Sequence, residues 1–168
     1  ILTGEHAWCQ LFSEPGSGSD LAGASTKAEL LDGKWLINGQ KVWNTSAHHA
    51  DFGILVARTD WDLPKHQGLS YFLINMRQPG VEARPLKQMN GHASFNEVFM
   101  TDAIVLAEDL MGGEGNGWAI ATTTLSIERQ GFARGRTPTV SREPKEGLVY
   151  QELSAELDVA NEPYIWYP

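Results

Sequence analysis

The sequence predicts a mainly β protein, an antiparallel β-barrel or sandwich domain followed by one or two α-helices of a truncated helical domain. Short runs of β-branched and aromatic residues, separated by turn dipeptides, extend from Ala7 to about Ala107. No helical period falls between these runs, and one begins only after a glycine-rich segment at 112–117. Strands that follow one another without intervening helices favour a barrel or sandwich over a parallel α/β sheet.

Turn residues separate the candidate strands throughout this region. Asp32-Gly33 and Asn38-Gly39 each lie between two strand-like runs, and both pairs favour two-residue hairpin turns whose central residues take positive φ. We therefore expect three consecutive antiparallel strands around these turns. The expected strands are Ala7–Ser13, Ala24–Leu31, Lys34–Ile37, Gln40–Thr45, Phe52–Arg58, Leu69–Asn75, Val81–Pro85, Phe95–Met100 and Ile104–Leu106.

A helical period starts after the glycine-rich segment. Trp118, Ala121, Leu125, Glu128 and Phe132 recur at steps of three and four residues, which places them on one face of a helix. Residues 1–110 are then a β-domain, and residues 111–168 start a helical domain. Its expected parts are a helix over 118–133, a proline-containing linker over 137–147 and a second helix over 149–160.

The composition excludes several classes of function. The 168 residues include 13 Lys and Arg against 21 Asp and Glu, and the net charge of −8 disfavours nucleic acid and anionic lipid as partners. The single cysteine forms no internal disulfide, and His48 and His49 would point to opposite faces of a continued strand, so we expect no metal site. No membrane span and no secretory leader is visible, which predicts a cytoplasmic protein, with an organelle matrix as the alternative.

The most unusual segment is a loop of small residues directly after a strand, Glu14-Pro15-Gly16-Ser17-Gly18-Ser19-Asp20. It lacks the third glycine and the following helix of a dinucleotide fingerprint, and the Gly-Lys-Ser/Thr of a phosphate-binding loop. Its backbone can approach a ligand closely, and its hydroxyl and amide groups suit an anionic or carbonyl oxygen. An ordinary flexible turn is the alternative.

Two further positions are candidates for chemistry. Strict alternation places Trp43 and Thr45 on one face of their strand, where an indole beside a hydroxyl suits an aromatic ligand ring; core packing of the indole is the alternative. Glu128 shares a helix face with apolar residues, where a carboxylate has the raised proton affinity of a general base. A boundary residue that reaches water or an ion pair is the alternative there.

These segments together resemble the middle β-domain of the acyl-CoA dehydrogenases. Residues 8–20, from Trp8-Cys9 to Gly18-Ser19-Asp20, resemble the aromatic-Cys and Thr-Glu-Pro-x-x-Gly-Ser-Asp signature of that family, with Ser13 in place of the Thr. Residues 38–45 resemble its Asn-Gly-x-Lys-x-Trp-Ile-Thr strand, with Asn44 in place of the apolar residue. The segment 113–118 and the helix ending in Glu128-Arg129 also follow the family pattern.

The resemblance implies an FAD-dependent enzyme that oxidises an acyl-CoA thioester to the trans-2-enoyl-CoA by α-proton abstraction and β-hydride transfer to FAD. It also implies an electron-transfer flavoprotein as the acceptor, and a homo-oligomer, either a dimer or a tetramer. The residues that it places at the flavin are Gln10, Leu11, Phe12, Ser13, Gly18, Ser19, Trp43, Asn44 and Thr45. The residues that it places at the substrate are Ser19, Ser126 and Arg129.

The catalytic base is Glu128 if the chain follows the minority of the family that carries the base on this helix, in an Asp-Leu-Glu-Arg context. Most members carry it in a C-terminal helical domain beyond this chain. Two rival functions remain: an acyl-CoA oxidase or flavin monooxygenase of the same fold, and a non-enzymatic β-barrel binding module. The length and branching of the acyl group are not defined by these residues.

Overall fold

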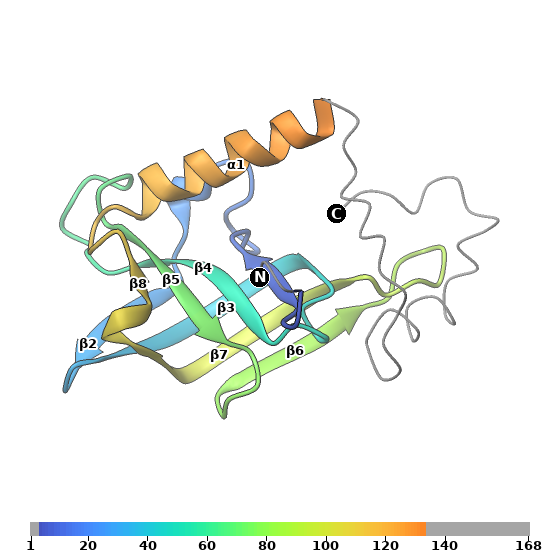
Figure 1. Ribbon diagram of the computed structural model, residues 1–168, viewed down its shortest axis with the longest axis horizontal. Coiled ribbons are helices and arrows are strands. Elements are labelled where there is room, and N and C mark those ends of the chain that lie inside the picture. The colour runs from blue at the N-terminus through green and yellow to red at the C-terminus, as the bar shows by residue number, and fades with distance from the viewer. Residues whose placement is uncertain (1–3, 134–168) are drawn as a thin grey trace. The chain divides into compact units, whose positions relative to one another are not determined.

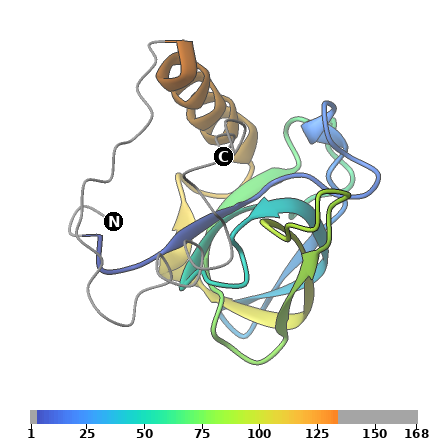
Figure 2. The same cartoon turned by 90° about the vertical axis from the view of Figure 1, so that its right-hand side faces the viewer.

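A computed structural model describes residues 4–133, including the side chains of residues 4–130. Eight strands form one sheet and one α-helix follows them, which confirms a mainly β fold (Figure 1). The strand order is β6-β7-β3-β2-β4-β5-β8, with β1 paired to β4, so the sheet is open (Figure 2). The expected linker at 137–147 and helix at 149–160 lie outside the described residues, and the domain boundary at 110 stays a prediction.

Seven of the eight described strands overlap the expected runs, and β8 is an additional strand. The strands are β1 (Trp8–Leu11), β2 (Lys27–Leu31), β3 (Lys34–Thr45), β4 (Phe52–Arg58), β5 (Leu69–Asn75), β6 (Val81–Leu86), β7 (Phe95–Leu106) and β8 (Leu110–Met111). Two short 3₁₀ turns, η1 (Leu21–Gly23) and η2 (Ala107–Asp109), and the helix α1 (Gly117–Ala133) complete the fold. Figure 2 shows the strands curling around a common interior.

Of the two hairpins expected from turn dipeptides, one is present and one is not. Asp32 and Gly33 have φ of 50° and 76° and connect β2 to β3 in an antiparallel hairpin. The hairpin expected at Asn38-Gly39 is wrong, because β3 runs straight through this dipeptide. The strand has a register shift between Ile37 and Gly39 and keeps β7 as its partner on both sides of it.

β3 continues through this dipeptide because its partner strand also continues past it. The two short strands expected at 95–100 and 104–106 are one strand, β7, which is as long as β3 and pairs with it antiparallel. Asn38 donates its Nδ2 to the Asp102 carboxylate at 2.9 Å and accepts the Asp102 backbone N–H at 2.9 Å. The Asn38 side chain thus bonds across the strand pair, and Asp102 takes the positive φ of 51°. The result is a β-bulge.

One strand pairing also differs from the expected antiparallel succession. β1 lies parallel to β4, with Trp8 opposite Phe52 and Leu11 opposite Leu55. Parallel neighbours need a long crossover, and residues 12–51 supply one that includes the β2–β3 hairpin. This pairing brings the segment after β1 next to β3, where the candidate site lies.

The core has two apolar layers. The larger fills the curl of the sheet and includes Leu11, Ile37, Leu55, Phe72 and Val98. The smaller lies between the sheet and the first turns of α1, and includes Phe12, Val56, Leu69, Tyr71 and Ala121. A Cβ at Gly117 would lie 2.6 Å from the backbone carbonyl carbon of Ser70, so glycine allows the helix to start directly on β5. No helix in the described part of the chain is long and apolar enough to cross a membrane.

Candidate functional site

The first wall of the candidate site is β1 with the two residues that follow it. Leu11 is fully buried inside the sheet, so only its backbone can face a ligand. Phe12 is buried on the other side of the strand, where its ring meets Tyr71 edge-on at a centroid distance of 5.9 Å. Gln10 and Ser13 are half-buried and therefore accessible to a bound molecule.

The second wall is the end of β3. The register of β3 against β7 shifts between Val42 and Asn44, and Trp43 between them has a φ of 63°. This bulge interrupts the strict alternation that predicted a shared face for Trp43 and Thr45. The indole is 62% exposed, touching Phe95 edge-on, while Thr45 is half-buried. A large apolar ring left this exposed on a sheet is a candidate ligand-stacking surface.

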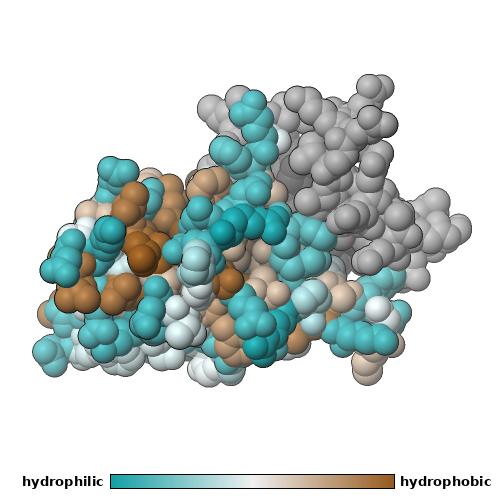
Figure 3. Space-filling view, turned by 90° about the horizontal axis from the view of Figure 1, so that it is seen from below, coloured by the Kyte–Doolittle hydropathy of each residue, from teal (hydrophilic) through white to brown (hydrophobic). Residues whose placement is uncertain are grey.

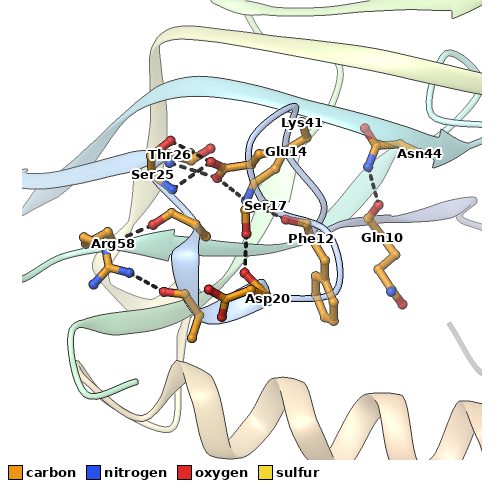
Figure 4. Close-up of polar contacts among 12 residues, drawn as sticks. Gln10, Phe12, Glu14, Ser17, Asp20, Ser25, Thr26, Lys41, Asn44 and Arg58 are labelled. Carbon is orange, nitrogen blue, oxygen red and sulfur yellow. Dashed lines mark hydrogen bonds and ion pairs between the residues drawn. The ribbon is translucent and has the colours of Figure 1, made fainter. Parts of the chain in front are cut away.

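Two hydrogen bonds join these walls. The backbone N–H of Val42 donates to the carbonyl of Ser13 at 2.9 Å. Asn44 is buried and donates its Nδ2 to the carbonyl of Gln10 at 2.7 Å (Figure 4). The side chain of Asn44 is therefore used to hold β1 against β3, and the structure brings the expected flavin residues of both segments together.

The Gly/Ser loop between the walls is an ordered turn. Glu14 and Ser17 exchange two backbone hydrogen bonds, of 2.7 and 3.0 Å, and the Ser17 hydroxyl donates to the carbonyl of Asp20 at 2.6 Å. Gly18 and Ser19, at the tip, are exposed. A Cβ at Gly18 would meet nothing within 4 Å, so this part of the loop is open for a ligand.

A buried ion pair that sequence reasoning missed lies at the foot of this loop. Lys41 Nζ donates to Glu14 Oε1 at 2.8 Å, and the side chains are 0% and 4% exposed. Burial alone would raise the pKa of Glu14, but the charge of Lys41 and the hydrogen bonds to the carboxylate outweigh it and lower the pKa to about 2. Burial lowers the pKa of Lys41 to about 8 although Glu14 opposes that shift. The available sequence signal was a lysine inside an otherwise uncharged run of β3, which alone does not predict burial.

The candidate residues on α1 have different surroundings. Ala121 and Leu125 pack toward the sheet, whereas Ser126, Glu128 and Arg129 are exposed. The Ser126 hydroxyl donates to the carbonyl of Thr122 at 2.8 Å, within the helix. The assignment of Glu128, Ser126 and Arg129 to the site stays a prediction.

The donor set suits a planar ligand with polar edges. The hydroxyls of Ser13 and Thr45 and the exposed indole of Trp43 lie on adjoining segments, and a flat heteroaromatic ring can stack on the indole while its edge accepts hydrogen bonds. The strand does not continue through His48 and His49, which follow β3 in a turn with their ring centroids 3.8 Å apart, so the opposite faces expected for a continued strand do not apply. Among residues 4–130, no cluster of three or more His, Cys, Asp or Glu could hold a metal ion.

The comparisons with known proteins agree on one family. The sequence model of the acyl-CoA dehydrogenase middle domain matches residues 9–103. The chain is 49% identical over 161 residues to the acyl-CoA dehydrogenase FadE34 of Mycobacterium tuberculosis, covering 96% of this chain and 22% of that protein. It spans 22% to 44% of the length of three curated relatives that it matches.

Solved structures give the same result. The structure described as the Tcur3481-Tcur3483 steroid ACAD has a TM-score of 0.74 and 27% identity, and the match covers 97% of this chain and 41% of that one. The structure of PigA with FAD and proline has a TM-score of 0.69 and 28% identity, with 74% of this chain and 33% of that chain covered.

Proposed function

The chain belongs to the acyl-CoA dehydrogenase family, and we propose that the complete protein oxidises an acyl-CoA thioester to the trans-2-enoyl-CoA with FAD as its cofactor. The observation that carries this proposal is the joining of the Ser13 and Trp43 walls by the Val42–Ser13 hydrogen bond. That bond brings two separate sequence segments with the family's motifs to one place.

The residues of this chain would hold FAD from both segments. The Ser13 and Thr45 hydroxyls would donate hydrogen bonds to the edge of the ring system, and the Trp43 indole would pack against the ring. Gln10 would contribute its side chain, while Leu11 would contribute only its backbone, because its side chain is fully buried. Phe12 would support the ring from the layer beneath α1, and Gly18 and Ser19 would lie where the flavin and the CoA arm meet.

In the proposed reaction, FAD supplies the hydride acceptor when it is bound. Glu128 would remove the α-proton of the acyl group through its carboxylate, while the β-hydrogen leaves with its electron pair and the Cα–Cβ double bond forms. The exposure of Glu128 in this chain means that the apolar surroundings of the base would come from the rest of the protein. Arg129 and Ser126 would contact the substrate from the same helix.

Mutation of Glu128 tests the assignment of the base. In the complete protein, Glu128→Gln removes the proton acceptor and should slow flavin reduction by the substrate by roughly 10²–10⁴-fold. Stopped-flow absorbance measures this rate directly. The control is Glu108→Gln, an exposed residue of η2, which should reduce its flavin at the wild-type rate. A normal rate in Glu128→Gln would assign the base to the helical domain beyond this chain.

The reaction class is tested by the visible spectrum of the complete protein before and after anaerobic addition of acyl-CoAs. Bleaching of a flavin spectrum by an acyl-CoA is the expected result, and absence of flavin after FAD is added back would contradict the proposal in favour of a binding module. The panel should include straight, branched and steroid-derived acyl-CoAs, because one structural neighbour is described as a steroid ACAD. A neighbour with FAD and proline makes amino acids a useful second panel.

The electron acceptor and the assembly are further parts of the proposal. We expect the reduced protein to pass its electrons to an electron-transfer flavoprotein and to react slowly with O₂. Fast reoxidation by O₂ would instead indicate the oxidase or monooxygenase of the same fold. We expect the complete protein to be a homo-oligomer, which size-exclusion chromatography with light scattering measures.

A further inference from the structure

The buried pair of Glu14 and Lys41 is not explained by stability alone. The two charged atoms are 2.8 Å apart and almost completely removed from water. Removing two charges from water costs several kcal/mol per ion, and apolar replacements of such pairs are often neutral or stabilising. The role of the pair is therefore sought in the segments that it contacts, more than in its contribution to the free energy of folding.

Glu14 closes the base of the Gly/Ser loop. Its Oε1 accepts the backbone N–H of Thr26 at 2.9 Å, and its Oε2 accepts the backbone N–H and the hydroxyl of Ser25, both at 2.7 Å. The carboxylate at the start of the loop thus holds Ser25 and Thr26, which lie between η1 and β2, as Figure 4 shows. The intervening residues, with Gly18 and Ser19 at the tip, form a closed loop.

Lys41 bonds to both residues that flank Ser13 in the chain. Its Nζ donates to the carbonyl of Phe12 at 3.0 Å as well as to Glu14. The next residue of β3, Val42, donates its backbone N–H to the Ser13 carbonyl. Ser13 therefore lies between two residues that are both bonded to Lys41. Trp43 follows Val42 directly, so the same short stretch of β3 holds Ser13 in the first wall and begins the second wall.

We propose that the Glu14–Lys41 pair is a positioning device for the flavin site, which fixes the Ser13 hydroxyl and the Gly/Ser loop relative to Trp43 and Thr45. The proposal rests on the proposed function, since that function places a flavin between these walls. Both side chains are almost fully buried, so neither would contact the flavin directly. They act through the Phe12 and Ser13 backbone and through Ser25 and Thr26, which lie between η1 and β2.

The test uses the complete flavoprotein and a variant without either charge, Glu14→Gln with Lys41→Met. Removing both charges avoids a lone buried ion, so this variant should fold. FAD affinity, measured by reconstituting the apoprotein, should fall about tenfold, which equals the loss of roughly one hydrogen bond to the ligand. The visible circular dichroism of the bound flavin should change, and the amides of Ser25 and Thr26 should exchange with deuterium faster than in the wild type.

The control is Lys65→Met, which removes an exposed ion pair with Asp20 on the same loop. Surface pairs contribute little, so its FAD affinity and flavin spectrum should match the wild type. A double variant that folds and keeps wild-type FAD affinity and flavin dichroism would overturn the proposal.

The outcomes separate this proposal from the proposed function. A wild-type protein that binds FAD but does not reduce it with any acyl-CoA contradicts the reaction and leaves the positioning test intact. A wild-type protein that binds no FAD removes the flavin site and overturns both. If the amides of Ser25 and Thr26 exchange at the wild-type rate in the double variant, the part of the proposal in which Glu14 anchors these two residues is overturned. This measurement can be made with or without bound FAD.

Discussion

Arg58 places a buried charge among backbone carbonyls. Its guanidinium donates to the carbonyls of Ala22 at 2.7 Å, Ala24 at 3.0 Å and Lys65 at 3.4 Å. The bonds to Ala22 and Ala24 hold η1 and the residue after it against the end of β4 (Figure 4). Arg58 thus supports the far side of the loop that Glu14 closes at its base.

Replacing Arg58 with Met should lower the free energy of unfolding by about 1–3 kcal/mol, because buried carbonyls lose their donors. Urea denaturation of the complete protein measures the change. The matched control is Arg84→Met, an exposed residue paired with Glu82, which should leave the stability close to that of the wild type. Equal effects of the two substitutions would show that the bonds of Arg58 do not stabilise the loop.

Glu14 should make the fold sensitive to acid. Its pKa in the folded protein is about 2, below the ordinary glutamate value of 4.5, so the unfolded chain binds more protons at acidic pH. Its contribution to stability is therefore fully present above pH 4.5 and is lost as the pH falls toward 2. Unfolding of the wild type should show a stability loss in this window that the variant lacking Glu14 and Lys41 does not show. Parallel curves for the two proteins would contradict the lowered pKa.

At the scale of elements, the length of β3 decides the site. Because β3 continues past Gly39, one strand carries both the hairpin with β2 and the segment with Lys41 and Trp43. Gly39 has a φ of 158°, and a Cβ there would lie 2.6 Å from Thr26 Oγ1 and 2.8 Å from Thr26 Cα. The glycine of the dipeptide is thus required by the close approach of Thr26, the residue before β2, instead of by a hairpin turn.

Gly39→Ala should destabilise the fold by about 1–3 kcal/mol, since the backbone of Thr26 has to move to accommodate the methyl group. Thermal or urea unfolding measures this change. Gly16→Ala is the control, because a Cβ at Gly16 meets nothing within 4 Å, and its stability should stay near that of the wild type. A neutral Gly39→Ala would mean that β2 and β3 lie further apart than described.

At the scale of the whole molecule, exposed apolar side chains favour association between copies of the chain, and the net charge opposes it. Leu31 and Ile104 are 57% and 44% exposed, on strands of the same sheet. Figure 3 shows apolar side chains gathered on one part of the face seen from below. The net charge of −8 opposes association of copies of the chain.

The exposed apolar side chains should cause the isolated 168-residue chain to associate in solution, and the association should increase as salt screens the opposing net charge. Light scattering at low and high ionic strength measures this. Leu31→Lys with Ile104→Lys should reduce the association, because it replaces two exposed apolar side chains with charged ones. A wild-type chain that stays monomeric at high salt would contradict the prediction.

The sequence by itself determined what depends on neighbouring residues. Alternating apolar runs predicted the strands, Asp32-Gly33 predicted a hairpin that is present, and the three- and four-residue steps after residue 117 predicted α1. Motif residues such as Ser13 and Trp43 were also visible, because their identity and spacing carry the family resemblance.

Only the tertiary structure decided what depends on contacts between distant segments. The parallel pairing of β1 with β4, the bulges at Gly39 and Trp43, and the burial of Glu14 with Lys41 all require a partner far along the chain. Local sequence cannot specify them, because the same Asn-Gly dipeptide fits a hairpin or a bulge, and the same lysine fits a solvated strand face or a buried pair. The free energy of the partner contacts decides between these states.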